Sequence, residues 1–307
     1  MEVVEYQIHW LSLTVKEDWK TGFDLYNNIF RDRFGPLVFL GNGGRGFKEI
    51  HHSLLEIKLY CIPNNENSVY FHLEIPGQAC EAMTEEYYFE LYRYLESNFH
   101  EEYLFKRLDF AFDNVNFTPK QLSNAIIEER TRTLAKRETF TIRESPYKKK
   151  DDGTLGTYTA ELGSNTSERM ITCYNKRGYT RLEFQTRDKR ADSVARALFQ
   201  VDNSEKWFNI AASHLRDYID FNTSWWTEFV NCQSRANLKI SDPRNVSLEN
   251  LYEWLYRQVA CGLSVITDAL PPEAIEMLIK SGRIRRGGRY ELLLRNYMSE
   301  KSRRNDE

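Results

Sequence analysis

The segment from 168 to 187 carries residue types that could act on a phosphodiester. Its two halves, ERMITCYN and TRLEFQTR, alternate apolar and polar residues around an NKRG turn, which predicts a β-hairpin. Successive side chains of a strand point to opposite faces, so Ile171, Cys173, Leu182 and Phe184 would face a core. The other face then holds Met170, Thr172, Tyr174, Arg181, Glu183, Gln185 and Arg187. This face suits chemistry on phosphate, and a solvated sheet face is the alternative.

Two other predicted strands carry charged residues on one face. FKRLDFAFDNVNF at 105–117 places Arg107, Asp109 and Asp113 opposite its apolar side chains, and SVYFHLEIPG at 68–77 places His72 and Glu74 in the same way. Carboxylates that share a polar face repel each other unless a cation or hydrogen bonds compensate. If these strands lie in one sheet with the hairpin, their polar residues gather on one face.

A carboxylate cluster of this kind prefers a hard divalent cation, Mg²⁺ or Mn²⁺. The expected ligands are Asp109, Asp113, Glu183 and Glu74, with His72 as a nitrogen donor. A metal would polarise a phosphate oxygen, and Tyr174 would attack phosphorus. A free phenol has a pKa of about 10 and needs a metal, a base or cations to act as a nucleophile. Lys176, Arg177 and Arg181 are the cations close to it in sequence.

The composition is that of a globular protein. The chain has 307 residues, of which 41% are hydrophobic and 14% aromatic, enough for one large domain or two. No apolar run approaches the roughly 18 residues of a membrane span, and MEVVEYQIHW does not resemble a signal peptide. Five scattered cysteines without a C-x-x-C motif fit reduced thiols. We therefore expect a cytoplasmic protein with no membrane partner.

Positive charge is concentrated in particular segments, although the net charge is −3. Residues 168–190 contain seven Lys and Arg against three acids, and residues 280–304 contain nine against two. Residues 51–104 instead contain ten acids against two bases. Basic segments attract DNA phosphates. The basic residues expected to bind DNA are Arg107, Arg177, Arg187, Lys148, Lys149, Lys150, Arg285 and Arg286.

The order of elements predicts an α+β fold with an antiparallel-rich central sheet, helices on one face and an open catalytic face. Strands are predicted at 8–15, 54–60, 68–77 and 105–117, and helices at 18–30, 84–99 and 118–129. We expect a polar, mobile loop at 136–157. Beyond residue 188 the pattern is helical, including one helix over 247–270. We place a catalytic domain at 1–200 and a helical C-terminal region, which is expected to contribute to DNA binding, at 201–307.

Five motifs in this order resemble the replication initiation factor family, the Rep type of rolling-circle plasmids and filamentous phages with related conjugative relaxases. They are RLDFAFD at 107–113, LGSNTSER at 162–169, CYNK at 173–176, TRLEFQTR at 180–187 and WLYRQVACGL at 254–263. GNGGRGF at 41–47, IPGQAC at 75–80 and SWWTEF at 224–229 also look similar. The His-hydrophobe-His metal motif of other rolling-circle initiators is absent, as in the family that this chain resembles.

The resemblance implies a metal-dependent DNA nicking-joining endonuclease. Such an enzyme nicks one strand of an origin, stays joined to the 5′ end through a phosphotyrosine and leaves a free 3′-OH for a polymerase. The family tyrosine falls on Tyr174, with Lys176 and Arg181 beside it, and the family carboxylates fall on Asp109, Asp113 and Glu183. Host helicase and polymerase would be partners, and a homodimer is compatible. The alternatives are a conjugative relaxase with the same chemistry and a non-catalytic, sequence-specific DNA-binding protein.

Overall fold

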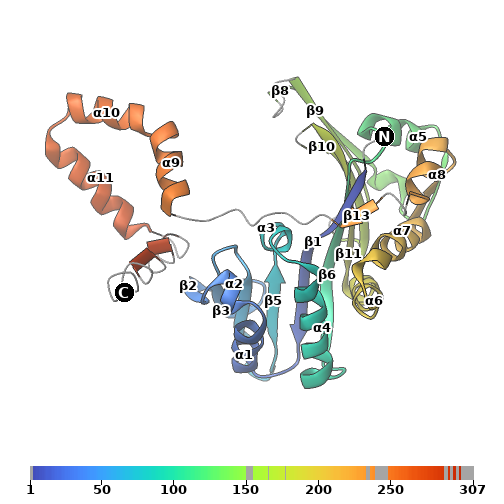
Figure 1. The fold of residues 1–307 in the computed structure, drawn as a ribbon, viewed down its shortest axis with the longest axis horizontal. Coiled ribbons are helices and arrows are strands. Elements are labelled where there is room, and N and C mark those ends of the chain that lie inside the picture. Colours follow the sequence, from blue (N-terminus) through green and yellow to red (C-terminus); the bar gives the residue numbers. More distant parts are fainter. Residues whose placement is uncertain are drawn as a thin grey trace. The chain divides into compact units, whose positions relative to one another are not determined.

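The computed structural model describes residues 3–149, 155–164, 166–176, 178–232, 236–238 and 248–286, with residues 290, 293, 294, 297 and 298. The chain divides into two compact units (Figure 1). The first unit contains residues 1–17 and 72–242, and the second contains residues 18–71 and 243–307. No helix among the described residues is both long enough and apolar enough to cross a membrane.

A mostly antiparallel sheet forms the centre of the first unit. Its strands are β1 (Val4–Val15), β5 (Phe71–Ile75), β6 (Tyr103–Asp113), β8 (Thr141–Lys149), β9 (Leu155–Leu162), β10 (Arg169–Lys176) and β11 (Tyr179–Arg187). Neighbouring strands follow the order β5-β1-β6-β11-β10-β9-β8. β13 (Ala236–Leu238) adds to β1 in parallel, and β7 (Thr131–Thr133) pairs with β12 (Ile219–Phe221) in a separate ribbon. The predicted antiparallel sheet is thus confirmed, with the hairpin β10–β11 beside β6.

Helices cover the apolar face of this sheet. They are α4 (Glu85–Phe99), α5 (Pro119–Ile127), α6 (Asp188–Phe199), α7 (Trp207–Tyr218) and α8 (Ser224–Val230), while the short α3 (Gly77–Glu81) lies against β1. Figure 1 shows α6 and α7 next to β6 and β11, and α6 packs on both strands. The ring of Phe112 on β6 meets Phe208 of α7 and Phe229 of α8, with centroids 5.5 and 5.3 Å apart. α7 and α8 therefore share the core of the central sheet, although the predicted functional boundary lies near residue 201.

Alternation along β10 and β11 matches the prediction. Ile171, Cys173, Leu182 and Phe184 are buried in the core. The opposite face is less open to solvent than the polar composition suggests, because Arg181 and Glu183 are buried as well. A buried arginine and carboxylate need partners, so this face has an internal network of charges instead of a layer of water.

β1 contains an irregularity that matters for the site. Its register with β6 shifts between Ile8 and Trp10. The buried apolar positions Val4, Tyr6 and Ile8 precede the shift, and Leu11, Leu13 and Val15 follow it with the opposite parity. An extra residue of this kind is a β-bulge, which re-aims the side chain at the bulge. Here the residue between the two paired positions is His9.

Three predicted elements differ from the structure. The expected loop at 136–157 contains β8, which pairs with β9 from Thr141↔Glu161 to Lys149↔Leu155. The polar composition of β8 concealed the strand, because an edge strand is stabilised by its ladder without a buried face. The strand expected at 54–60 is β4, Lys58–Pro63. The expected helix at 247–270 is broken at Val259 into α9 (Leu248–Gln258) and α10 (Ala260–Ala269).

The second unit combines α1 (Trp19–Ile29) and α2 (Arg31–Phe34) with the strands β2 (Val38–Asn42), β3 (Phe47–His52) and β4. β3 pairs antiparallel with β2 and with β4. Gly22 of α1 permits close packing, because a Cβ there would lie 3.0 Å from the side chains of Leu59 and Phe71. The same unit includes α9, α10 and α11 (Pro272–Ile284), so the predicted helical C-terminal region is confirmed.

Candidate active site

The hydroxyl of Tyr174 is held by a carboxylate on the neighbouring strand. Tyr174 Oη donates a hydrogen bond of 2.6 Å to Glu183 Oε1. In the ladder Tyr174 pairs with Arg181, and Thr172 pairs with Glu183, so the bond runs diagonally across the hairpin. Burial, and then the negative charge of Glu183, raise the pKa of Tyr174 well above that of a free phenol. The phenol is therefore protonated at rest, and Glu183 is placed to accept its proton.

Arg181 lies between this pair and β6. It is completely buried, and it binds both carboxylate oxygens of Asp113, which is 1% exposed. The second of these hydrogen bonds, from Nη2 to Oδ2, is 2.7 Å long. Although burial opposes the charged form, the hydrogen bonds and charge of Asp113 raise the pKa of Arg181. Arg181 Nη1 has no hydrogen-bond partner among the described residues and lies 3.6 Å from Glu183 Oε1. A permanent cation thus has one free donor beside Tyr174 and Glu183.

The Asp113 carboxylate also accepts hydrogen bonds from a second residue of β11 and from β1. Tyr179 Oη donates to Oδ2 at 3.3 Å, and Gln7 Nε2 of β1 donates to the same oxygen at 3.5 Å. Because Arg181 occupies both Asp113 oxygens, Asp113 as a metal ligand stays a prediction that competes with this ion pair.

Two residues that the sequence did not indicate, His9 and Glu81, connect Glu183 to Lys176. His9 Nδ1 lies 3.7 Å from Glu183 Oε1, and His9 Nε2 lies 4.0 Å from Glu81 Oε1 of α3. Lys176 Nζ lies 3.5 Å from the same Glu81 oxygen. Burial, and then the positive charge of Arg181, lower the pKa of Lys176. The side chains of β1, α3, β10 and β11 thus form a continuous polar cluster.

Asp109 occupies a second part of the polar face. Arg107 binds it in a bidentate ion pair, from Nε to Oδ1 at 2.9 Å and from Nη2 to Oδ2 at 2.6 Å, and the Arg107 guanidinium stacks on Trp10 with 4.5 Å to the ring centre. Burial raises the pKa of Asp109 to about 6 although Arg107 opposes the rise, and the negative charge of Glu183 adds to it. The charges of Glu74, Asp109 and Glu183 all act on Arg107.

The donors expected at a metal lie on this face, with β1 between β5 and β6. Glu74, Asp109 and Glu183 are buried, and His72 Nδ1 is within hydrogen-bond distance of Thr14 Oγ1 at 2.9 Å. Among the described residues, no three His, Cys, Asp or Glu side chains are already arranged around one point as metal ligands. Burial is the main cause of the raised pKa of Asp109, and the negative charge of Glu183 adds to it. Hard oxygen donors in such surroundings fit a divalent cation.

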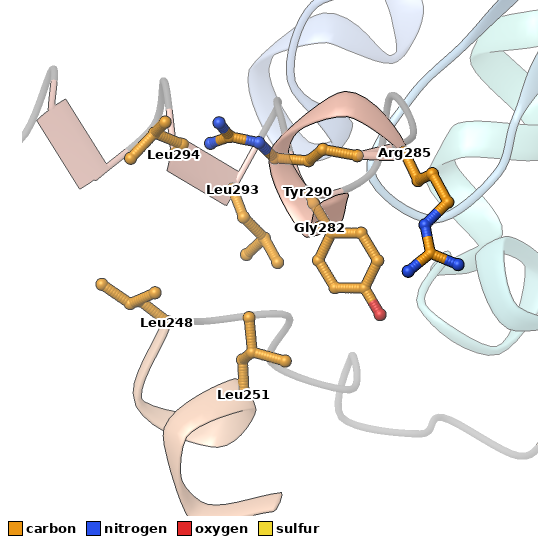
Figure 2. Close-up of a pocket in the computed structure, with 8 residues that line it drawn as sticks. Leu248, Leu251, Gly282, Arg285, Tyr290, Leu293 and Leu294 are labelled. Atoms are coloured by element: carbon orange, nitrogen blue, oxygen red, sulfur yellow. The ribbon is translucent and has the colours of Figure 1, made fainter. Parts of the chain in front are cut away.

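The residues expected to bind DNA fall in several places. Arg187 donates to Gln185 Oε1 and to the backbone carbonyls of Ser164 and Ser167, at 3.0, 3.4 and 3.1 Å. Lys148 and Lys149 belong to β8, whereas Lys150 and Arg177 lie outside the described residues. Arg285 and Arg286 line a cavity of about 420 Å³ in the C-terminal helices. Figure 2 shows Leu248 and Leu251 of α9 facing Leu293 and Tyr290 across this cavity.

His9 and Glu81 escaped the sequence reasoning for different reasons. In a regular strand at 8–15, His9 would have the parity of Leu11 and Leu13 and would therefore lie on the apolar face. The apolar residues occupy even positions up to Ile8 and odd positions from Leu11 onward. This change in the alternation is the sequence signal that could have indicated the bulge. Glu81 belongs to a five-residue helix with no apolar periodicity long enough to be read.

Comparison with known proteins identifies the family. The model of the family described as replication initiation factor matches residues 103–280. The chain belongs to the replication initiation factor family. A rolling-circle replication initiator protein from Geobacillus stearothermophilus has the same fold, with a TM-score of 0.59 and 19% sequence identity over 78% of this chain and 99% of the other. No curated protein sequence matches the chain. The matched segment of this replication initiation factor contains β6, β10 and β11.

Proposed function

We propose that the protein initiates rolling-circle replication by nicking one strand of an origin with Tyr174 as the nucleophile. The observation that carries the proposal is the 2.6 Å hydrogen bond from Tyr174 Oη to Glu183 Oε1, with the buried Arg181 beside it. The family membership and the shared fold support a role in replication initiation. The proposal is further supported by the closeness of the three side chains, since Glu183 Oε1 lies 2.6 Å from Tyr174 Oη and 3.6 Å from Arg181 Nη1.

The first step needs a base because the phenol is protonated at rest. Tyr174 Oη gives its proton to Glu183 and forms a bond to phosphorus, while the bond from phosphorus to the 3′ oxygen breaks. The 3′ oxygen takes up a proton from water, so the products are a 5′-phosphotyrosine and a free 3′-OH. Religation follows the reverse path, with the Glu183 carboxyl returning the proton to Tyr174.

Two cations are placed to stabilise charge on the phosphate. Arg181 presents Nη1 toward Glu183 and Tyr174, and its position is set by Asp113. Lys176 follows two residues after Tyr174 on the same strand face. Preorganised donors lower the barrier because they need no rearrangement when the charge develops.

Glu74, Asp109 and Glu183, with His72, are the residues that would hold Mg²⁺ or Mn²⁺. A bound metal would polarise a non-bridging phosphate oxygen. Glu183 then has to serve as base and ligand through different oxygens, and Oε1 is the one that faces Tyr174.

The product of this reaction defines the partners. A free 3′-OH requires a polymerase, and displacement of the old strand requires a helicase, so we propose that host enzymes of both kinds act with this protein in the cytoplasm. The basic residues Arg187, Lys148 and Lys149 and the C-terminal arginines are proposed to contact DNA phosphates. A homodimer is the oligomer that we propose for this activity.

The test uses a supercoiled plasmid that carries the coding region of the protein. With Mg²⁺ or Mn²⁺ we expect an open-circular product and a 5′ adduct that mass spectrometry maps to Tyr174, and with EDTA we expect neither. Tyr174→Phe should bind the plasmid without forming the adduct. Tyr158→Phe is the matched control, because Tyr158 is one residue from Thr159, the partner of Tyr174 in the ladder, and points to the other face.

Tyr179→Phe gives a second control on the same face as Tyr174. The Tyr179 hydroxyl lies against Asp113, so the variant should still form the adduct. An adduct that persists in Tyr174→Phe contradicts the assignment of the nucleophile. Nicking that is unchanged by EDTA contradicts the proposed metal requirement, and binding without any nicking favours a non-catalytic DNA-binding protein.

A further inference from the structure

We infer that His9 is a positioning residue of the nicking reaction, which keeps Glu183 directed toward Tyr174. This inference rests on the proposed function and extends it to β1, a strand outside the segment that the family model matches. His9 is 3.7 Å from the Glu183 oxygen that accepts the Tyr174 hydrogen bond. Its role is to limit the orientations of that carboxylate.

The backbone of β1 is arranged to place this imidazole. Ladder pairing runs from Ile8↔Phe110 directly to Trp10↔Asp109, so His9 is left without a paired position on β6. His9 keeps the parity of Gln7, whose side chain reaches Asp113, whereas Leu11 and Leu13 beyond the bulge are completely buried in the core. A bulge interrupts the ladder locally and is commonly found beside active sites. The interruption here leaves His9 on the face that carries Glu183 and turns Leu11 and Leu13 back to the core.

Gly77 provides the space for the ring. A Cβ on Gly77 would lie 3.0 Å from Cε1, Nε2 and the carbonyl oxygen of His9. Gly77 is the first residue of α3 and its φ is not in the left-handed region, so the backbone conformation does not require glycine. Glycine in a helix is less stable than alanine. Close approach of His9 is the physical reason for a glycine at this position.

His9 also joins Glu183 to a second carboxylate and a cation. Its Nε2 lies 4.0 Å from Glu81 Oε1, and Lys176 Nζ lies 3.5 Å from the same oxygen. The ring therefore has a carboxylate on each side, and the Glu81–Lys176 pair restrains it from α3 and β10. Glu183 in turn is restrained by two neighbours. His9 of β1 lies 3.7 Å from its Oε1, and Arg181 of the same strand, β11, lies 3.6 Å from that oxygen. A base held in this way loses fewer orientations when Tyr174 transfers its proton.

The test compares three substitutions at one position in single-turnover adduct formation on the full-length protein, with an oligonucleotide that spans the mapped nick. An asparagine amide takes the place of Nδ1, which faces Glu183, and a glutamine amide takes the place of Nε2, which faces Glu81. We expect His9→Ala to lower the maximal rate about 10- to 100-fold. His9→Asn should recover most of this loss, and His9→Gln should recover little. The DNA concentration at half-maximal rate and the thermal midpoint should stay near wild type.

Gly77→Ala would push on the His9 ring from α3. It should therefore lower the maximal rate as His9→Ala does, although His9 itself is unchanged. Gly262→Ala is the matched control, because Gly262 also lies in a helix and a Cβ there meets nothing within 4 Å. Equal rates for His9→Ala and wild type overturn the inference. The inference is also overturned if His9→Ala lowers DNA affinity or thermal stability instead of the maximal rate. It is overturned as well if His9→Asn is no faster than His9→Ala. A wild-type protein that forms no Tyr174 adduct overturns the proposed function itself, whereas failure of His9 alone leaves the Tyr174 adduct intact.

Discussion

Asp113→Asn tests whether Asp113 serves Arg181 or a metal ion. Asp113 and Arg181 are buried to 1% and 0% exposure and share a bidentate ion pair. Removing one partner of such a pair leaves an uncompensated buried charge and costs about 3–5 kcal/mol. At about 2–4 °C per kcal/mol for a domain of 150–250 residues, the midpoint of the first unit should fall by about 6–20 °C. The measurement is thermal unfolding in EDTA, followed by circular dichroism and by the fluorescence of the buried Trp207 and Trp226.

The use of EDTA separates the two roles. A metal ligand contributes no stability when metal is absent, so an unchanged midpoint in EDTA would refute the role of Asp113 as the partner of Arg181. Glu102→Gln is the control, because its 3.3 Å ion pair with Lys16 is exposed and such pairs contribute about 0–1 kcal/mol. The double variant Asp113→Leu with Arg181→Met removes both charges. It should recover stability relative to Asp113→Asn while remaining unable to nick DNA.

Three further predictions follow from single side chains. Lys176→Met should lower the nicking rate about 100- to 1000-fold, as loss of a preorganised donor does, and Lys176→Arg should retain part of the rate; equal rates for Met and Lys would contradict the role of the cation. Burial, and then the positive charges of Lys58 and His51, lower the pKa of His52 to about 4. The unfolded chain therefore binds more protons than the folded chain between about pH 6.5 and pH 4, and stability should fall as the pH falls through this range. His52→Gln should flatten that dependence in acid titrations of unfolding, and an unchanged slope would count against it. Thr118 caps α5 in a capping box with Gln121, so Thr118→Ala should destabilise the protein by about 1 kcal/mol in urea unfolding, and Lys120→Ala in the same helix should not.

Much of the candidate site could be predicted from alternation alone. The parity of 169–176 and 179–187 correctly separates the core residues Cys173 and Phe184 from the polar residues Tyr174 and Glu183. This works because a strand with one buried face has a strict period of two. The capping box of α5 and the glutamates in the first turn of α4 are equally local signals. The division between 1–200 and 201–307 stays a prediction, since α7 and α8 pack on the central sheet of the first unit.

Long-range pairing could not be predicted, because period-two alternation does not say which strands are neighbours. β1 lies between β5 and β6, so it separates His72 and Glu74 from Asp109 and adds Trp10 to the polar face. The assignment of Arg181 to Asp113 arises from the β6–β11 register. β8 shows the same limit, because its polar sequence forms a strand through the ladder with β9.

The amino-acid sequence by itself determined the α+β class, the hairpin and the residues that share its polar face, because these depend on local periodicity. Only the tertiary structure decided which of those residues touch. It made Glu183 the hydrogen-bond partner of Tyr174, gave Arg181 to Asp113 and placed His9 at the site beside a bulge and a glycine. The physical reason is that such contacts depend on strand order, register and the space between elements, which are properties of the packed chain and not of any one segment.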